Sequence, residues 1–320
     1  MMHSASGDTG CVIGIDVGGT AMKAVVARLD GTPLFRQRRP TQRADGPVEV
    51  LTRIAAFASD LLGDARSRGM EPVGVGLAVP GQVDEARGVA VGATNIGWDQ
   101  VPLKDELTAA LGLPVAVRHD VRAGALAEAR QGEGRAHRNF IFLPIGTGIG
   151  CAIVLGGKPF TGDHYAAGEI GHVPIRGVSD RCLCGRTGCL ETVASATAIA
   201  RRYSELSGQS TANSEVVASA ARDGDVMAQE VWAHAISALA DAILASNTLL
   251  DIDNYVIGGG LAMAGPQLLE PLKQAIAQRP HEGCRPVLVL AGLGDEAGSI
   301  GAALSIIDEL QPSNGEGGST

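Results

Sequence analysis

Short apolar runs separated by glycine turns dominate the beginning of the chain. Cys11–Asp16 forms one such run, Gly18 and Gly19 interrupt it, and Ala24–Arg28 resumes it. Apolar runs bounded by glycines are typical of β-strands joined by a tight turn. The segment therefore predicts a β-hairpin at the start of the fold.

The hydrophobic spacing then becomes helical. Apolar residues recur every three or four positions in Pro47–Arg68, which predicts an amphipathic helix, and Val73–Val79 predicts a strand that ends at Pro80. Val115–Arg118 predicts another strand, and Ala123–Arg130, rich in Ala, Leu and Glu, predicts a helix.

His119 and Asp120 fall between that strand and that helix. Junctions of this kind expose side chains to ligands in α/β proteins. Asp120 is therefore a candidate functional residue, although an aspartate in front of a helix is also a common N-cap.

The middle of the chain repeats the opening pattern. Phe140–Ile145 and Cys151–Leu155 are apolar runs on either side of the turn Gly146–Gly150. Two glycine-centred hairpins, one on each side of residue 118, indicate an internally duplicated architecture.

In the last third of the chain, the spacing of apolar residues predicts helices at Val226–Asn247 and Ser299–Leu310. Between them, Asn254–Ile257 predicts a buried strand that runs into Gly258–Gly260. The polar ends, 1–10 and 311–320, are expected to be disordered.

Length and composition narrow the class of protein. The 320 residues suffice for two domains, and 45% hydrophobic residues with 44 glycines fit a soluble α/β enzyme. A net charge of −9 argues against a nucleic-acid-binding surface, which is normally basic. The first ten residues lack the features of a secretory signal, and no run of 18 apolar residues occurs. We therefore expect a cytoplasmic protein with neither nucleic-acid nor membrane partners.

The first glycine turn has the chemistry of a phosphate site. Asp16, Gly18, Gly19 and Thr20 place a carboxylate, two residues without Cβ and a hydroxyl together, so backbone N–H groups can approach a phosphate while Asp16 faces its metal. Lys23 adds a cation. An ordinary glycine hairpin is the alternative. The chain contains neither a P-loop motif nor a G-x-G-x-x-G that opens a helix, so a different nucleotide fold is needed.

Two further turns extend this prediction. The turn containing Gly146, Thr147, Gly148 and Gly150 offers a second phosphate cradle. Gly258, Gly259 and Gly260 offer a third turn at a strand end, although such a triplet also serves plain turn geometry.

Three turns in this order resemble the ROK family (repressors, open reading frames, sugar kinases) of the actin-like ATPase superfamily. The resemblance becomes specific at Gly168–His172 and Cys182–Glu191, which look like the family's E-x-G-H and C-x-C-G-x-x-G-C-x-E signatures. It covers roughly Cys11 to Leu304. It implies an α/β, two-lobed, actin-like (ribonuclease H-like) ATPase fold with a central mixed sheet in each lobe.

The resemblance also implies how the lobes and the site are arranged. A small lobe, 11–118, would be completed by the helix 299–310, and a large lobe, 119–298, would carry a zinc-binding insertion at 172–191. ATP with Mg²⁺ would lie on the large lobe and a hexose between the lobes. Asp120 matches the family's catalytic base. The residues that match or adjoin its sugar ligands are Gly81, Asn95, His119, Asp120, Glu169, His172 and Glu191.

The chain departs from the family pattern beside Asp120. The family usually has asparagine immediately before the aspartate and again two residues after it, where this chain has His119 and Arg122. His119 either replaces the missing sugar contact or leaves it to water.

Three cysteines crowd into eight positions. Together with one histidine they provide four ligands of the kind that tetrahedral zinc prefers, His172, Cys182, Cys184 and Cys189. The alternative is three reduced structural thiols beside an unrelated histidine. A structural zinc ion on one nitrogen of His172 would orient its other nitrogen toward a sugar hydroxyl.

The resemblance ranks the possible functions. Transfer of phosphate from ATP to the 6-hydroxyl of glucose comes first, as a step in carbohydrate metabolism and glycolysis, followed by N-acetylmannosamine, N-acetylglucosamine and other hexoses. A homodimer or homotetramer is expected. The alternative of a sugar-binding repressor would require an N-terminal helix-turn-helix of many tens of residues, whereas the first phosphate turn here begins at Asp16. Other actin-like ATPases, such as chaperones and filament proteins, have no role for the cysteine cluster.

Overall fold

The computed structural model describes residues 9–210, 213–280, 283 and 285–311. The chain divides into two compact units. The first comprises Met1–Ala127 with Glu296–Thr320, and the second comprises Glu128–Asp295. The segments expected to be disordered lie almost entirely outside the described residues, which begin at residue 9 and end at residue 311.

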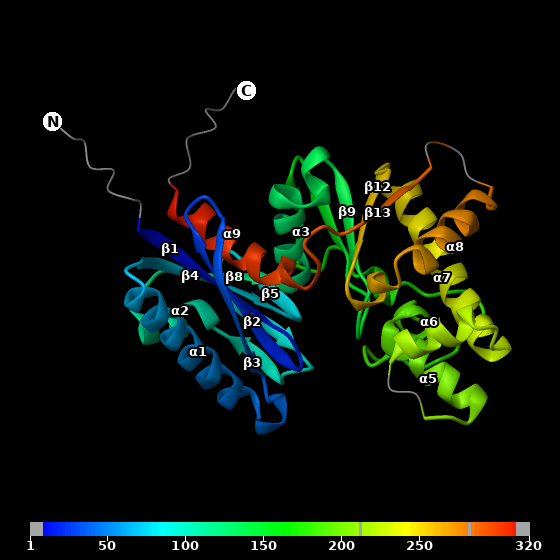
Figure 1. The fold of residues 1–320 in the computed structure, drawn as a ribbon, viewed down its shortest axis with the longest axis horizontal. Helices are drawn as coiled ribbons and strands as arrows, with labels where there is room; N and C mark the ends of the chain where they lie inside the picture. Colours follow the sequence, from blue (N-terminus) through cyan, green and yellow to red (C-terminus); the bar gives the residue numbers. More distant parts are fainter. Residues whose placement is uncertain (1–8, 211–212, 281–282, 284, 312–320) are drawn as a thin grey trace. The chain divides into compact units, whose positions relative to one another are not determined.

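A five-stranded mixed sheet forms the centre of the first unit (Figure 1). Its strands lie in the order β3 (Pro33–Pro40), β2 (Ala21–Arg28), β1 (Gly10–Val17), β4 (Glu71–Val79) and β8 (Val115–His119). The pairs β3–β2 and β2–β1 are antiparallel, whereas β1–β4 and β4–β8 are parallel. The predicted hairpin at residues 11–28 is thus confirmed as β1 and β2.

Helices cover both faces of this sheet. Helices α1 (Pro47–Ser67) and α2 (Leu103–Leu111) join the hydrophobic core of one face, and α9 (Ala297–Leu310) packs on the other. Side chains alternate between faces along a strand. The positions that face α9 include Gly14 and Gly76, where an added Cβ would collide with the backbone of α9. Glycine at these positions lets α9 approach the strands closely.

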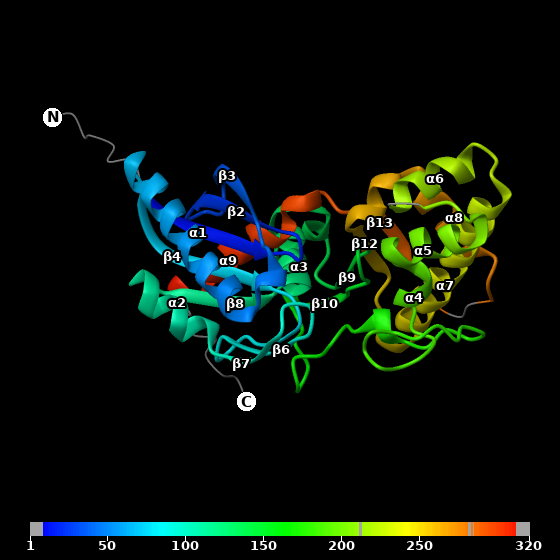
Figure 2. The same cartoon turned by 90° about the horizontal axis from the view of Figure 1, so that it is seen from below.

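A smaller sheet, absent from the sequence-based prediction, lies beside β8 and α2 (Figure 2). It consists of three short antiparallel strands, β5 (Gln82–Asp84), β6 (Val89–Ala93) and β7 (Trp98–Val101). The indole of Trp98 is buried and donates a hydrogen bond of 3.1 Å to the carbonyl of Pro47 at the start of α1. This contact ties the small sheet to the helical face.

The second unit repeats the strand arrangement of the first. Its order is β11 (Lys158–Pro159), β10 (Ala152–Leu155), β9 (Phe140–Pro144), β12 (Asn254–Gly258) and β13 (Val287–Leu290). Again the first two pairs are antiparallel and the last two are parallel. The two sheets therefore share order and direction, which confirms the duplicated architecture predicted from the two hairpins.

Helices build most of the second unit's core. They are α4 (Glu191–Ala194), α5 (Ala196–Ser207), α6 (Ser214–Arg222), α7 (Val226–Leu250) and α8 (Pro266–Ala277), and α3 (Asp120–Gln131) crosses the boundary between the units. Among the described helices, α7 alone has the length and hydropathy of a membrane span. It contacts α4, α5, α6 and α8 and buries residues on most of its turns, so it serves as a core helix.

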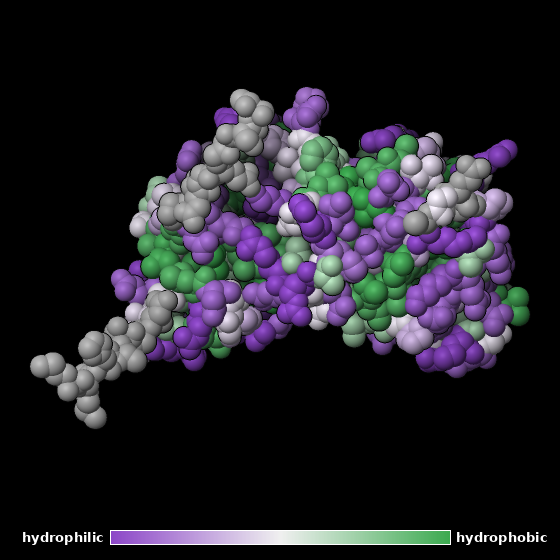
Figure 3. Space-filling view, turned by 90° about the horizontal axis from the view of Figure 1, so that it is seen from above, coloured by the Kyte–Doolittle hydropathy of each residue, from purple (hydrophilic) through white to green (hydrophobic). Residues whose placement is uncertain are grey.

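The outer surface of the chain mixes both kinds of residue. Figure 3 shows hydrophilic residues spread over the visible face between smaller hydrophobic areas. The exposed large hydrophobic residues come from separate elements, such as Val48 at the start of α1 and Leu249 at the end of α7. Scattered exposure of this kind is normal for a protein in water.

Candidate active site and metal centre

The first glycine turn is held by a residue that no sequence motif indicated. Thr41 is completely buried at the end of β3, and its hydroxyl donates a 2.6 Å hydrogen bond to the carbonyl of Gly18. Its backbone N–H donates to the carbonyl of Thr20 at 3.0 Å. Thr41 thus fixes both sides of the turn that joins β1 and β2.

Asp16 lies beside this turn, next to Lys23 on β2 and Gly298 on α9. It lies directly opposite Lys23 on the antiparallel strand, so both side chains stand on the same face of the sheet. That face carries α9, and a Cβ on Gly298 in its first turn would lie 2.6 Å from the Asp16 carboxyl carbon. Asp16 is therefore packed tightly against the N-terminus of a 14-residue helix, where backbone N–H groups favour anions.

Strand register places Asp16 and Asp120 at one edge of the first sheet. Asp16 is opposite Ala78 on β4, and Ala78 is opposite Arg118 on β8. The three strands are parallel, so their carboxyl ends share an edge, and Asp120 begins α3 two residues after Arg118. Neighbouring strands lie about 4.8 Å apart, which separates the two strand ends by about 10 Å.

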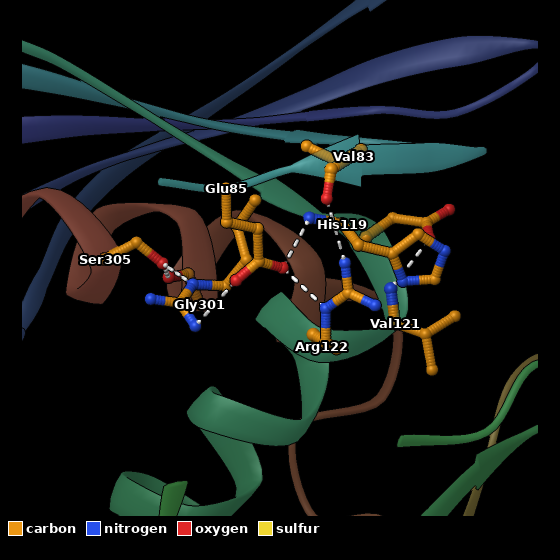
Figure 4. A network of polar contacts seen from close by, with 9 residues as sticks. Val83, Glu85, His119, Val121, Arg122, Gly301 and Ser305 are labelled. Carbon is orange, nitrogen blue, oxygen red and sulfur yellow. Dashed lines mark hydrogen bonds and ion pairs between the residues drawn. The ribbon is translucent and has the colours of Figure 1, made fainter. Parts of the chain in front are cut away.

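Polar contacts hold the Asp120 carboxylate in one orientation (Figure 4). Its Oδ1 accepts a 2.7 Å hydrogen bond from the N–H of Val121 and lies 3.3 Å from His119 Nε2. The first contact is to the N–H of the next residue, not to the N–H two or three residues on that an N-cap side chain binds. Burial raises the pKa of Asp120 to about 6, against the opposing effects of the Val121 N–H and the Arg122 guanidinium. A carboxyl group with this pKa can accept a proton near neutral pH.

Two other predicted sugar ligands also belong to the first unit. Asn95 is exposed in the turn between β6 and β7. Gly81 has a φ of +90°, and a Cβ there would collide with the carbonyl of Gly92 on β6. Glycine at position 81 is thus required by backbone conformation and by packing against the small sheet.

The second and third glycine turns meet in the second unit. The N–H of Ile145 donates to the carbonyl of Gly258 at 2.9 Å, and the N–H of Leu261 donates to the carbonyl of Ile145 at 2.9 Å. Gly259 has a φ of +77° and leaves no room for a Cβ beside Ile145. The ends of the neighbouring parallel strands β9 and β12 therefore present both turns together.

Glu191 connects one of these turns to the cysteine-rich segment. Its Oε2 accepts a 2.9 Å hydrogen bond from the N–H of Ile149, and a Cβ on Gly148 would collide with that oxygen. Glu169 precedes His172 by three positions, and its Oε2 lies 3.8 Å from His172 Nε2. The structure thus links Glu191 to the turn and Glu169 to the histidine of the cluster.

The four predicted metal ligands converge. The ligand atoms of His172, Cys182, Cys184 and Cys189 all lie within 4.8 Å of one another. His172 Nδ1 is 3.6 Å from the Cys182 sulfur, and the Cys184 and Cys189 sulfurs are 3.7 Å apart. A tetrahedral zinc ion with Zn–S of about 2.3 Å and Zn–N of about 2.05 Å requires about 3.8 Å between sulfurs and about 3.6 Å between sulfur and nitrogen. The spacing fits zinc.

The protonation chemistry of the thiols also suits a metal. Burial and the two neighbouring thiols raise the pKa of Cys189 to about 12, whereas the N–H of Arg186 lowers the pKa of the exposed Cys184. Without a cation, three thiolates this close together would repel one another, and a bound metal stabilises the thiolate form. Because Nδ1 of His172 faces the thiols, Nε2 points to Glu169. The two ring nitrogens of His172 thus face different partners, the thiols on one side and Glu169 on the other.

Comparison with known proteins identifies relatives over almost the whole chain. Residues 12–309 match the model of the ROK family. The chain is 37% identical to a glucokinase of Halalkalibacterium halodurans, across 90% of this chain and 92% of that protein. It is 34% identical to a glucokinase of Thermotoga maritima, across 93% and 97%. The crystal structure of a ROK family glucokinase from Streptomyces griseus in complex with glucose and AMPPNP superposes with a TM-score of 0.80 at 29% identity, covering 93% of this chain and 99% of that one.

Proposed function

The chain belongs to the ROK family, and from this membership we propose that it transfers the terminal phosphate of ATP to the 6-hydroxyl of a hexose, with glucose as the first candidate. The observation that carries the proposal is Asp120. It lies at the carboxyl edge of the first sheet with a pKa raised to about 6, in a chain whose relatives phosphorylate glucose.

In the proposed reaction the oxygen of the sugar hydroxyl attacks the terminal phosphorus of ATP, and ADP leaves. Asp120 accepts the proton of that hydroxyl. Oδ1 accepts from the Val121 N–H and lies near His119 Nε2, and we assign Oδ2 to the hydroxyl. Phosphoryl transfer depends mainly on positioning and charge neutralisation, so the base contributes chiefly by orienting the hydroxyl and removing its proton.

The glycine turns supply the proposed nucleotide site. Backbone N–H groups of the turn at Gly18–Thr20 and of the turn at Gly146–Gly150 would bind phosphate oxygens, and the turn at Gly258–Gly260 would contact the adenosine. Asp16 would hold Mg²⁺, which neutralises charge on the phosphates when bound. Lys23 stands opposite Asp16 and adds a positive charge.

The remaining polar residues are assigned to the sugar. We assign Glu169, His172 and Glu191 of the second unit, and Gly81, Asn95 and His119 of the first, to contacts with sugar hydroxyls. Zinc on the three thiols and His172 Nδ1 would fix the imidazole and the start of α4, on which Glu191 lies. A cytoplasmic location and assembly as a homodimer or homotetramer are predicted from the resemblance.

The proposed activity is tested by measuring ADP release with saturating ATP and Mg²⁺. We expect release to depend on sugar, with the largest kcat/KM for glucose among glucose, N-acetylmannosamine and N-acetylglucosamine. Product analysis should locate the phosphate on the 6-hydroxyl. ADP release at the same rate without any sugar would contradict the proposed kinase, whereas preference for an amino sugar would revise only the substrate.

The contact between Asp16 and α9 leads to a separate prediction. In Gly298→Ala the new methyl group, 2.6 Å from the Asp16 carboxyl carbon, must displace either the carboxylate or the helix. We expect kcat/KM for ATP to fall by about 10²-fold, the effect of moving a catalytic group by about 1 Å.

Gly63→Ala is the matched control for that substitution. Gly63 is exposed on α1, and a Cβ there meets no atom within 4 Å. We expect unchanged kinetics and a slight gain in stability, since alanine restricts the unfolded chain. Unchanged kcat/KM in Gly298→Ala would show that Asp16 does not act on the nucleotide.

A further inference from the structure

A buried ion-pair cluster lies directly behind the proposed base (Figure 4). Arg122 belongs to the first turn of α3, its side chain is only 2% exposed, and its Nε donates a 2.6 Å hydrogen bond to Glu85 Oε1. Glu85 follows β5, and its side chain is 11% exposed. Burying two charged groups costs desolvation free energy, which their ion pair and further hydrogen bonds must offset.

The Glu85 carboxylate binds three groups that flank Asp120. Oε1 also accepts a 3.1 Å hydrogen bond from the backbone N–H of His119, and Oε2 lies 3.3 Å from Arg118 Nη1. One carboxylate therefore contacts the residues at positions −2, −1 and +2 relative to Asp120. It fixes the backbone at the point where β8 becomes α3.

Further contacts make this cluster rigid. Arg122 Nη2 donates to the carbonyl of Val83 at 3.5 Å, and Arg118 Nε donates to the Ser305 hydroxyl on α9 at 2.8 Å. Ser305 in turn donates to the carbonyl of Gly301 at 2.7 Å. A Cβ on Gly301 would collide with the carbonyl of Ala123, so α9 also lies against the first turn of α3.

The cluster carries a net positive charge next to the base. His119 Nε2 lies 3.3 Å from Asp120, and behind it the charged groups of the cluster are Arg118 from β8, Arg122 from α3 and Glu85 from the segment after β5. Helix α9 contributes the neutral Ser305, which contacts Arg118. Two guanidinium groups share one carboxylate, which leaves one positive charge in excess. The Arg122 guanidinium acts to lower the pKa of Asp120, because a nearby opposite charge favours the ionised form of a carboxyl group.

We propose that Glu85 and Arg122 are positioning residues for Asp120: their ion pair holds the 119–121 turn so that Oδ2 faces the substrate, and the excess charge of the cluster keeps the carboxylate ionised. The proposal rests on the proposed role of Asp120 as base. It also assigns a role to Arg122, at which the chain departs from the family pattern: the side chain turns inward to Glu85.

The test is the pH profile of kcat/KM for glucose at saturating ATP. Activity requires ionised Asp120, so it should fall as the pH falls through the pKa of that group, near pH 6 in the unaltered protein. We call this low-pH fall in activity the acid limb of the profile. In Arg122→Gln a positive charge is removed, and we expect the acid limb to move up by about one pH unit. In Glu85→Gln a negative charge is removed, and we expect the limb to move down by about one pH unit.

Two features keep the test decisive when a variant folds poorly. The position of the limb does not depend on how much enzyme is folded, so a partly unfolded preparation still reports it. Arg122→Lys retains the charge but loses the forked contact to Glu85 and Val83. We expect its limb to stay in place while kcat falls, by up to the roughly 10²-fold that a misplacement of about 1 Å costs.

Lys104→Gln is the control, because Lys104 forms an exposed ion pair with Glu309 in the same unit. Its profile should match that of the unaltered protein. Limbs that do not move in Arg122→Gln and Glu85→Gln, or an unchanged kcat in Arg122→Lys, would overturn the proposal. Full activity of an enzyme without the Asp120 carboxylate would instead remove the base assignment itself.

Discussion

Asp120→Asn is expected to lower kcat by roughly 10²- to 10⁴-fold, the usual effect of removing a general base, while glucose binding is retained. The amide has the size of the carboxylate and can still accept the hydrogen bond from the Val121 N–H, so the start of α3 should survive. It has no affinity for the hydroxyl proton. Single-turnover kinetics and glucose binding by calorimetry separate the chemical step from binding.

Asp99→Asn provides the matched control for that substitution. Asp99 is exposed on β7 in the same unit and is not among the proposed catalytic or binding residues. We expect its kinetics to be unchanged. If Asp120→Asn keeps more than about a tenth of the original kcat, general-base catalysis by this residue is contradicted, since that contribution is typically at least about 10²-fold.

Cys184→Ser is expected to remove the metal and reduce turnover by at least about 10²-fold. Serine is a poor zinc ligand, and three remaining ligands do not close a structural site. Loss of the ion would release His172 and loosen the segment that ends at Glu191, so two assigned sugar contacts would be lost together. Elemental analysis should show loss of about one equivalent of zinc, and the thermal midpoint should fall because metal binding stabilises the fold.

Leu183→Ser tests whether the loop itself tolerates change. Leu183 lies between two of the ligands, and its side chain is fully exposed, so its loss leaves no cavity. We expect normal zinc content and turnover in this variant. Cys184→Ser with bound zinc and normal turnover would rule out the assigned ligand.

The elements that sequence reasoning located are those whose pattern is local. The hairpin of β1 and β2 and the helices α1, α7 and α9 were each predicted to within a few residues, because buried residues recur at regular spacing within them. The cysteine cluster was predictable for a similar reason: three of its four ligands lie within eight positions, close enough for spacing alone to suggest a shared ion.

The elements and contacts that were missed depend on distant parts of the chain. Strand β3 lies at the sheet edge and has no fully buried residue, so it has no apolar run to mark it. The hydrogen bond between Glu191 and Ile149 joins residues 42 positions apart, and that between Arg122 and Glu85 joins residues 37 apart. Such pairs become visible only when the helices and turns that carry them are placed in the fold.

The position of α9 in the chain has a consequence for how the protein is made. This helix covers one face of the first sheet, yet it is encoded some 170 residues after the other parts of that unit, beyond the whole of Glu128–Asp295. During synthesis the second unit, which is continuous, can close on itself first. The glycine-lined strands of the first unit must wait with that face uncovered until α9 has left the ribosome, a period in which chaperones have an apolar surface to recognise.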